Sequence, residues 1–174
     1  MRNVVVVDGF RTPLCKEGTD FRNTDAEVLG AGVVRDMVRR CHRWNLSLQT
    51  IDCVLGSNVA TPMHAVNPTR VAAVTGGLPA TIPADTVAGK NCGSGVTALY
   101  YASLRIRSGD ADTVLVIGME AMSRIPLLYH PTVADLLLHN AKAKHFRERT
   151  AGALALIPKL LNLTRYPPRV GLMM

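Results

Sequence analysis

The sequence has few aromatic residues and no long hydrophobic run, and both absences restrict what the protein can be. Phe, Trp and Tyr make up 5% of the chain, too few to alternate with basic residues as stacking platforms for nucleic acid. No apolar run approaches the ~20 residues that span a bilayer. The start of the chain has only the short run Val4–Val7 and no small-residue cleavage site, so no signal peptide is expected. These absences disfavour nucleic-acid binding and predict a cytoplasmic protein.

The four cysteines lack the spacing of a disulfide framework or a metal site. Cys15, Cys41, Cys53 and Cys92 form no CxxC pair, so free thiols in a reducing compartment are expected and no metal is. Cys41 falls on the apolar face of a predicted helix and Cys53 in a predicted strand. Because free cysteines are usually buried, Cys15, Cys41 and Cys53 are interpreted as buried structural residues.

What the chain does contain is typical of one ordinary α/β domain. Its 174 residues are 48% hydrophobic and 19% charged, enough to bury a core but few for a large two-domain enzyme. The net charge of +7 is uneven: residues 1–134 carry 13 Lys and Arg against 11 Asp and Glu, and residues 135–174 carry 7 against 2. The charge distribution therefore predicts a body at 1–134 and a basic tail at 135–174.

Predicted strands alternate with helical patterns along the body. Thr24 and Glu27 fit a capping box at the start of the first helix, and Asn67-Pro68 is typical of the start of the second. The alternation predicts right-handed βαβ units and a mostly parallel sheet covered by helices. In the tail, helical composition from 135 to 163 is expected to be interrupted by Pro158 and ended by Pro167-Pro168. The predicted strands are 4–7, 51–56, 85–89 and 113–118, and the predicted body helices are 24–44, 67–74 and 96–106.

Cys92 occupies the most informative local arrangement in the sequence. It stands between a predicted strand and a predicted helix, flanked by Gly93 and Gly95, and such a turn projects a side chain from the carboxyl edge of the sheet, where open α/β sheets bind ligands. The positive end of the following helix favours a thiolate, and its N–H groups could stabilise an oxyanion. The glycines allow a substrate to approach the backbone. The residues alone leave two interpretations open, a nucleophile for acyl transfer and a buried structural cysteine.

Four motifs, in order along residues 4–130, resemble those of the thiolase family. The segment Asn91–Gly95 resembles the family's nucleophile motif, and residues 118–126 resemble its GGMESMSxxP segment, with Ile117 for the first Gly and Ala121 for the first Ser. The stretch that begins at Pro126 is most similar to long-chain 3-ketoacyl-CoA thiolases of fatty-acid β-oxidation. The remaining motifs are Arg11-Thr12-Pro13 and Asn67-Pro68-Thr69-Arg70, the latter followed by Gly77-Leu78-Pro79.

The resemblance implies a fold and a chemistry. It implies a thiolase-like N-terminal α/β half in which Cys92 is the nucleophile that carries the acyl group and its backbone N–H is an oxyanion donor. Thiolases cleave a 3-ketoacyl-CoA with CoA, or condense two acetyl groups in reverse. The implied cosubstrate is CoA, with no metal and no redox cofactor. The motif positions implied to bind substrate are Asn91, Gly93, Ser94, Gly95 and Met119.

Two groups that thiolases use have no counterpart in the sequence. The family needs a base and a second cysteine, in Gly-His-Pro and Cys-x-Gly-Gly contexts. His130-Pro131 is the nearest imitation, but Tyr129 stands where Gly is expected, so His130 is interpreted as a loop histidine. The chain is expected to be an N-terminal half with little activity alone, completed by a C-terminal half or a homo-oligomer. The other histidines, which belong to no motif, are His42, His64, His139 and His145.

The basic tail resembles the start of the loop domain that covers the active site in thiolases. Its charges could meet the phosphates of CoA or an anionic membrane surface, or form a solvated face. The residues concerned are Lys142, Lys144, Arg147 and Arg149.

Two other functions stay open as alternatives. A truncated chain could bind acyl-CoA or dimerise without catalysing a reaction. A ketoacyl synthase also places a cysteine at a helix start and acts on carrier-protein thioesters, but the segments 91–95 and 120–126 disfavour this reading.

Overall fold

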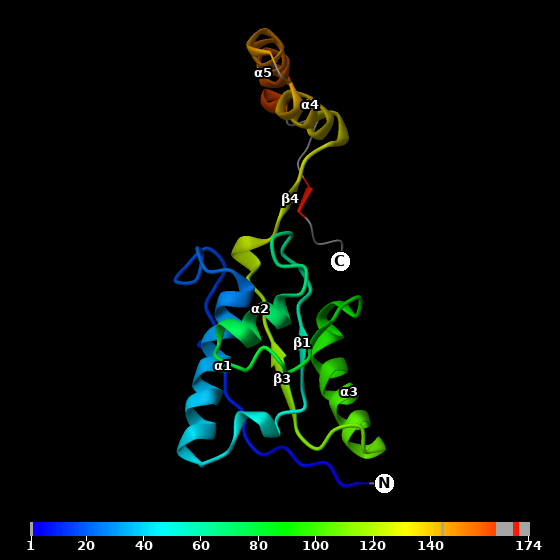
Figure 1. Cartoon of the computed structure of the whole chain (residues 1–174). Helices are drawn as coiled ribbons and strands as arrows, with labels where there is room; N and C mark the ends of the chain where they lie inside the picture. The colour runs from blue at the N-terminus through cyan, green and yellow to red at the C-terminus, as the bar shows by residue number, and fades with distance from the viewer. Residues whose placement is uncertain (1, 144, 163–168, 171–174) are drawn as a thin grey trace. The chain divides into compact units, whose positions relative to one another are not determined.

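The computed structural model describes residues 2–143, 145–162 and 169–170, which form two compact units that divide between Ile125 and Pro126. The first unit holds the sheet and the helices around it, and the second holds a pair of helices (Figure 1). This division precedes the change in charge at 134/135 from which the sequence predicts a boundary.

A three-stranded parallel sheet forms the centre of the first unit in the described residues. Strand β1 (Cys53–Ser57) lies between β2 (Ala84–Val87) and β3 (Val114–Gly118). Three of the four predicted strands are thus present, with small shifts at their ends. The predicted α/β class with a mostly parallel sheet is confirmed.

Helices cover both faces of this sheet, as Figure 1 shows. Helices α1 (Ala26–Arg43) and α2 (Pro68–Thr75) pack on one face, and α3 (Ser94–Ser108) packs on the other. Helix α2 begins as predicted, because the Asn67 side chain accepts a hydrogen bond of 3.0 Å from the Arg70 N–H. Helix α3 ends at Gly109, whose φ of 83° is the left-handed conformation common after a helix.

The two faces have separate hydrophobic cores. Successive side chains of a strand point to opposite faces, so Val54 and Ile117 enter the core under α1 and α2, whereas Leu55 and Val116 contact α3. Gly56 of β1 permits the close approach of α2, since a Cβ there would lie 2.0 Å from the hydroxyl oxygen of Thr69.

The predicted strand at 4–7 is wrong. Residues 2–16 have no regular secondary structure and pair with no strand among the described residues, and Val5, Val6 and Val7 are exposed. A strand needs a neighbour for its backbone hydrogen bonds, and the valine run has none here. Side chains hold the segment instead: Arg40 donates to Asp8 over 2.6 Å and stacks on the Phe10 ring at 4.4 Å.

The capping box predicted at Thr24 and Glu27 is also wrong. The N-cap of α1 is Asp25, which makes no side-chain capping bond within the described part of the chain. Tertiary partners take the acidic groups instead: Asp25 accepts from Arg124 Nε over 2.7 Å, and Glu27 lies 2.7 Å from His64 Nε2.

The second unit contains α4 (Pro131–Lys142) and α5 (Phe146–Leu161), with β4 (Leu127–Leu128) antiparallel to β5 (Arg169–Val170). The predicted interruption at Pro158 is wrong, because α5 continues through it. Proline removes a hydrogen bond to the carbonyl four residues earlier, and this residue, Leu154, is exposed, so water can replace the bond. None of the described helices has the length and apolar character needed to cross a membrane. Lys144 and Pro167-Pro168 lie outside the described residues.

Candidate active site

Cys92 lies in a sharp turn between β2 and α3, where the sequence predicts it. The turn requires left-handed backbone at Gly89, with φ of 78°, and at Asn91, with φ of 47°. Asn91–Gly93 then form a short 3₁₀ helix that leads directly into α3. Cys92 is exposed. A non-glycine residue held at positive φ beside an exposed cysteine is the kind of local strain that functional turns carry.

The start of α3 surrounds Cys92 with backbone rather than side chains. Gly93 is the N-cap and supplies no side-chain cap; its own N–H donates to the Lys90 carbonyl over 3.0 Å, and the Ser94 N–H donates to the Asn91 carbonyl. A Cβ at Gly93 would meet no described atom within 4 Å, whereas a Cβ at Gly95 would lie 3.5 Å from the Ser57 hydroxyl. The space next to Cys92 is therefore open at Gly93 and closed by β1 at Gly95.

Ser57, at the carboxyl end of β1, joins the neighbouring elements of the site. Its hydroxyl lies 3.5 Å from the position of a Cβ on Gly95 and 3.6 Å from that on Gly118 of β3. Ser94, the residue before Gly95, is buried, and its hydroxyl has no hydrogen-bond partner among the described residues. The carboxyl ends of β1 and β3 and the start of α3 thus meet at one edge of the sheet.

A buried polar network at the same edge was not predicted. Asn58 Nδ2 donates to the Met119 carbonyl over 3.0 Å and lies 3.3 Å from Glu120 Oε1, while the Val59 N–H donates to Glu120 Oε2 over 2.8 Å. Asn58 Oδ1 has no partner in the described part of the chain. The signal for Glu120 was its place in the 118–126 motif, but Asn58 follows a predicted strand with no motif of its own.

Met119, which the resemblance implies as a substrate-binding residue, is buried. Its side chain belongs to the core under α1, where its sulfur lies 2.9 Å from the position of a Cβ on Gly30. Its backbone N–H donates to the Ser57 carbonyl over 3.0 Å. Met119 is thus placed to hold β3 against β1 and α1.

The other three cysteines lie outside the turn that holds Cys92. All four are free; Cys41 and Cys53 are buried, as predicted, but the expected burial of Cys15 is wrong, because it lies exposed in the irregular segment before α1. Burial raises the pKa of the Cys41 thiol. Partial desolvation and the nearby Asp20 carboxylate raise the pKa of Cys15.

Four of the five histidines lie at or near helix ends, and His64 lies in the connection before α2. His130 is the N-cap of α4, where its Nδ1 accepts from the Thr132 N–H over 3.3 Å. His64 contacts Glu27. His42, His139 and His145 are exposed at or near helix ends.

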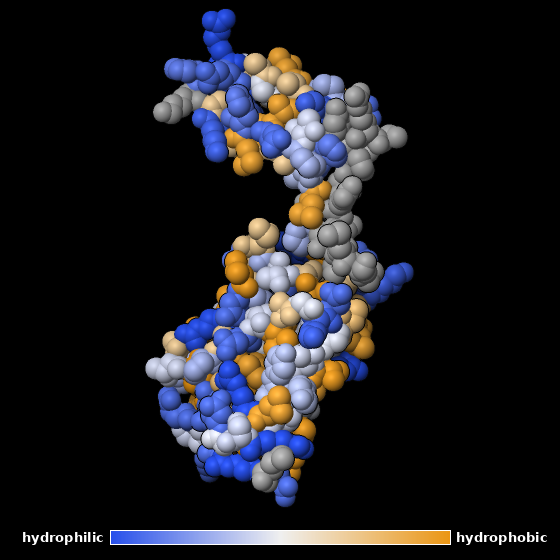
Figure 2. Space-filling model, turned by 90° about the vertical axis from the view of Figure 1, so that its right-hand side faces the viewer, coloured by the Kyte–Doolittle hydropathy of each residue, from blue (hydrophilic) through white to orange (hydrophobic). Residues whose placement is uncertain are grey.

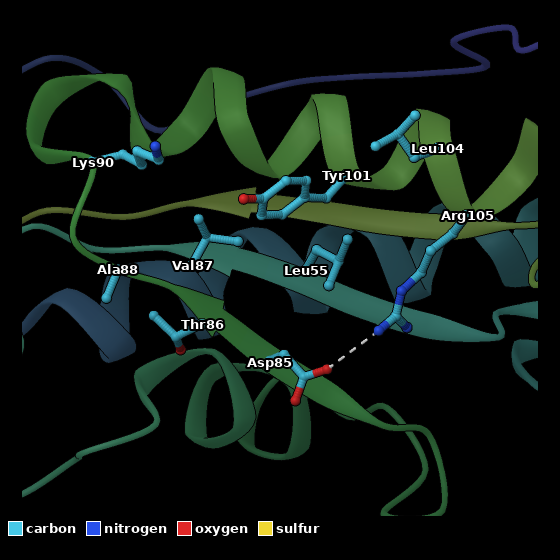
Figure 3. Close-up of a pocket in the computed structure, with 9 residues that line it drawn as sticks. All are labelled: Leu55, Asp85, Thr86, Val87, Ala88, Lys90, Tyr101, Leu104 and Arg105. Carbon is cyan, nitrogen blue, oxygen red and sulfur yellow. Dashed lines mark ion pairs between the residues drawn. The ribbon is translucent and has the colours of Figure 1, made fainter.

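An open pocket of about 480 Å³ lies between α3 and the strands β1 and β2. Figure 3 shows side chains from the strands facing those from α3 across it, with Lys90 and Arg105 toward opposite ends. Arg105 lies 3.8 Å from the Asp85 carboxylate. The largely apolar side chains that line the pocket include Leu55, Val87, Tyr101 and Leu104.

Known proteins resemble this chain over most of its length. A family model described as "Thiolase, N-terminal domain" matches residues 4–155. A "Probable acetyl-CoA acyltransferase" of Staphylococcus aureus strain NCTC 8325 / PS 47 is 33% identical over 165 residues, which cover 89% of this chain and 41% of the relative. The protein of the same name from strain bovine RF122 / ET3-1 is 32% identical with the same coverage.

A solved structure agrees with these relatives. The crystal structure of the Bacillus anthracis acetyl-CoA acetyltransferase aligns with a TM-score of 0.58 and 27% identity, covering 64% of this chain and 27% of that chain. This chain therefore spans about two fifths of the length of the curated relatives described above.

Proposed function

The chain belongs to the thiolase family, and we propose that it serves an acyl-CoA acyltransferase in which Cys92 carries the acyl group. The Cys92 thiol would lose its proton as its sulfur attacks the thioester carbonyl of acetyl-CoA, and a new thioester would form on that sulfur while the bond from the carbonyl carbon to the CoA sulfur breaks. CoA would leave as the thiol after its sulfur takes up the proton that Cys92 lost. CoA is the cosubstrate in this proposal. The observation that carries it is the exposed cysteine in a strained turn at the start of α3, inside the family's nucleophile motif.

The backbone around Cys92 supports an oxyanion site. Attack on a thioester moves negative charge to the carbonyl oxygen, and N–H groups at a helix start stabilise such charge. The open space at Gly93 gives the acyl group a path to these donors. We assign one donor to the Cys92 N–H and the approach of the substrate to the turn formed by Asn91, Gly93, Ser94 and Gly95.

The outward face of α3 indicates that this chemistry needs a further partner. Val96, Leu99 and Tyr100 are exposed, and Figure 2, which views the molecule from this side, shows hydrophobic side chains at the surface of the first unit. Apolar groups gathered on one surface mark an interface. We propose that a second copy of the chain or the remaining half of a thiolase covers α3 and supplies the base and the second cysteine.

The resemblance after Pro126 supports a role in fatty-acid β-oxidation, and four free cysteines support a reducing, cytoplasmic compartment. In the second unit, the exposed side chains of Lys142, Arg147 and Arg149 are proposed to meet CoA phosphates. An anionic membrane surface is the alternative contact for the same charges.

Mass spectrometry of the chain mixed with acetyl-CoA or a 3-ketoacyl-CoA tests the proposal. We expect an acyl mass on the peptide that contains Cys92, lost in Cys92→Ser and retained in Cys15→Ser, a matched control because Cys15 is also exposed. Turnover is expected to be low, since a thiol without its base loses orders of magnitude in rate. Acylation of Cys15 with none on Cys92 would contradict the proposal.

The apolar surface of α3 favours a second candidate function, a module that binds acyl-CoA or dimerises without chemistry. This candidate predicts that acyl-CoA binding and self-association are unchanged in Cys92→Ala and that no acyl mass forms. Equilibrium binding of acetyl-CoA and analytical ultracentrifugation of the two proteins therefore separate the functions.

A further inference from the structure

Asp25, Glu27 and His64 bring three potential metal ligands together away from the residues assigned to acyl transfer. Asp25 is the N-cap of α1, Glu27 lies in its first turn, and His64 belongs to the connection between β1 and α2. His64 Nε2 lies 2.7 Å from Glu27 Oε1 and 3.9 Å from Asp25 Oδ2. One ligand atom from each residue lies within 4.8 Å of the others.

The Glu27 carboxylate supplies a second and independent observation. Its side chain is only 7% exposed, and its Oε2 has no hydrogen-bond partner among the residues that the structure describes. A buried carboxylate oxygen without a partner is costly unless a cation or a donor satisfies it. His64 satisfies Oε1 only, so the buried group has unused capacity to accept positive charge.

We propose that Asp25, Glu27 and His64 bind a divalent cation of the zinc class. Imidazole nitrogen and carboxylate oxygen are both zinc ligands, and three protein ligands leave a fourth position for water. His64 is 59% exposed, so its ring can move away from Glu27 to admit the ion. With Nε2 bound to the metal, the ring proton resides on Nδ1.

Arg124 orients one of the three ligands. Its Nε donates to Asp25 Oδ1 over 2.7 Å, while the other oxygen, Oδ2, is the one nearest His64. Such a contact to the second oxygen of a ligating carboxylate fixes the direction of the first. Arg124 therefore positions Asp25 for the ion and does not bind it.

The ion would link two segments of the first unit that lie far apart in the sequence. It joins the start of α1 to the connection 58–67, which begins with Asn58 and its contact to Glu120. Because the ion binds only the folded arrangement, it is expected to raise the melting temperature. The proposed site uses no residue of the acyl-transfer machinery, so either proposal can fail without the other.

Zinc titration of the full chain tests the site. The experiment uses a Cys15→Ser/Cys92→Ser background, because exposed thiols also bind zinc. We expect one equivalent of Zn²⁺ by isothermal titration calorimetry, a rise in melting temperature, and a d–d absorption band when Co²⁺ replaces Zn²⁺. In His64→Gln, we expect the affinity to fall at least about tenfold and the thermal shift to disappear.

His42→Gln is the matched control, since His42 is also an exposed histidine. It lies in the last turn of α1, at the opposite end of that helix from Asp25 and Glu27. The His42→Gln variant should bind zinc as the background does. Glu27→Gln adds a second ligand variant, and His64→Gln guards against its failure to fold because His64 is largely exposed. Absence of binding in the background, or equal binding in the His64 and His42 variants, overturns the proposal and leaves a carboxylate–histidine pair only.

Discussion

The two faces of the sheet are built in different ways. On the face of α1 and α2, large side chains such as Val34, Val54 and Ile117 are buried in one continuous core. On the face of α3, small residues, Ala98 and Ala102, contact the sheet, and large apolar residues of the same helix point outward. Helices α1 and α2 also expose large apolar side chains, namely Val28, Val71 and Val74, but α3, which follows Cys92, exposes more of them. The two faces therefore differ in how much apolar surface their helices leave uncovered.

The most disruptive change is expected at the closest contact between the sheet and α2. In Gly56→Ala, the new Cβ would lie 2.0 Å from the Thr69 hydroxyl oxygen and 2.6 Å from its methyl group, so β1 and α2 must separate. We expect a loss of about 3 kcal/mol or more in the free energy of unfolding, measured by urea denaturation.

Gly32→Ala in α1 is the control for that substitution. A Cβ at Gly32 meets no described atom within 4 Å, and alanine is the better helix former, so a gain of about 0.5–1 kcal/mol is expected. Equal stabilities for the two variants would show that the tight contact between β1 and α2 is not as described.

A smaller effect is expected from a pair of substitutions in α3 that separates its two sides. Ala98 is fully buried against the sheet, so Ala98→Leu should overpack that contact and cost about 2 kcal/mol of unfolding free energy. Leu99→Glu, on the exposed side, should change stability by less than about 0.5 kcal/mol. It should also weaken self-association in analytical ultracentrifugation.

The reverse result for this pair would break the comparison between the faces. A large loss of stability in Leu99→Glu, with little change in Ala98→Leu, would mean that the apolar side of α3 is already buried. Unchanged self-association in Leu99→Glu would remove the second copy as the partner of this surface.

The smallest expected effect concerns Asp52, which holds the starts of β1 and β3 together within the sheet that both faces share. Its Oδ2 accepts hydrogen bonds from the N–H groups of Asp112 and Thr113 over 2.7 and 3.0 Å. The bond from Thr113, and to a smaller extent the bond from Asp112, lower the pKa of the Asp52 carboxyl. A lowered pKa stabilises the fold above the unfolded pKa of about 3.9, and this contribution disappears as pH falls through the folded pKa.

Melting temperatures of Asp52→Asn and the unchanged protein between pH 7 and pH 2 check this contribution. The variant should melt earlier at neutral pH, and the difference should shrink as the medium becomes acidic. Glu17→Gln, which alters an exposed carboxylate, should show no such trend. A difference for Asp52→Asn that stays constant over the whole range would contradict the assigned hydrogen bonds.

Local signals were sufficient to predict the parts of the fold that local chemistry determines. Asn67-Pro68 stands at the start of α2, and apolar runs correspond to β1 and β3. The turn at Cys92 follows from the order of a strand, a glycine-flanked cysteine and a helix.

Features that depend on distant partners could not be predicted from these signals. The valine run at 4–7 has strand composition, but its pairing depends on a neighbour elsewhere. Periodicity placed Val96, Leu99 and Tyr100 on a helix without indicating that Ala98 would face the sheet. The contact of Glu27 with His64 joins residues 37 positions apart, which no local motif records.

Relative alkylation rates of the four cysteines test most directly the claim that Cys92, at the start of α3, is the activated nucleophile. Iodoacetamide treatment of the folded chain near neutral pH, followed by peptide mass spectrometry, gives each rate. The account predicts that Cys92 reacts first, ahead of Cys15, which is also exposed but whose thiol has a raised pKa, with the buried Cys41 and Cys53 last. Alkylation of Cys15 as fast as or faster than Cys92 would contradict it.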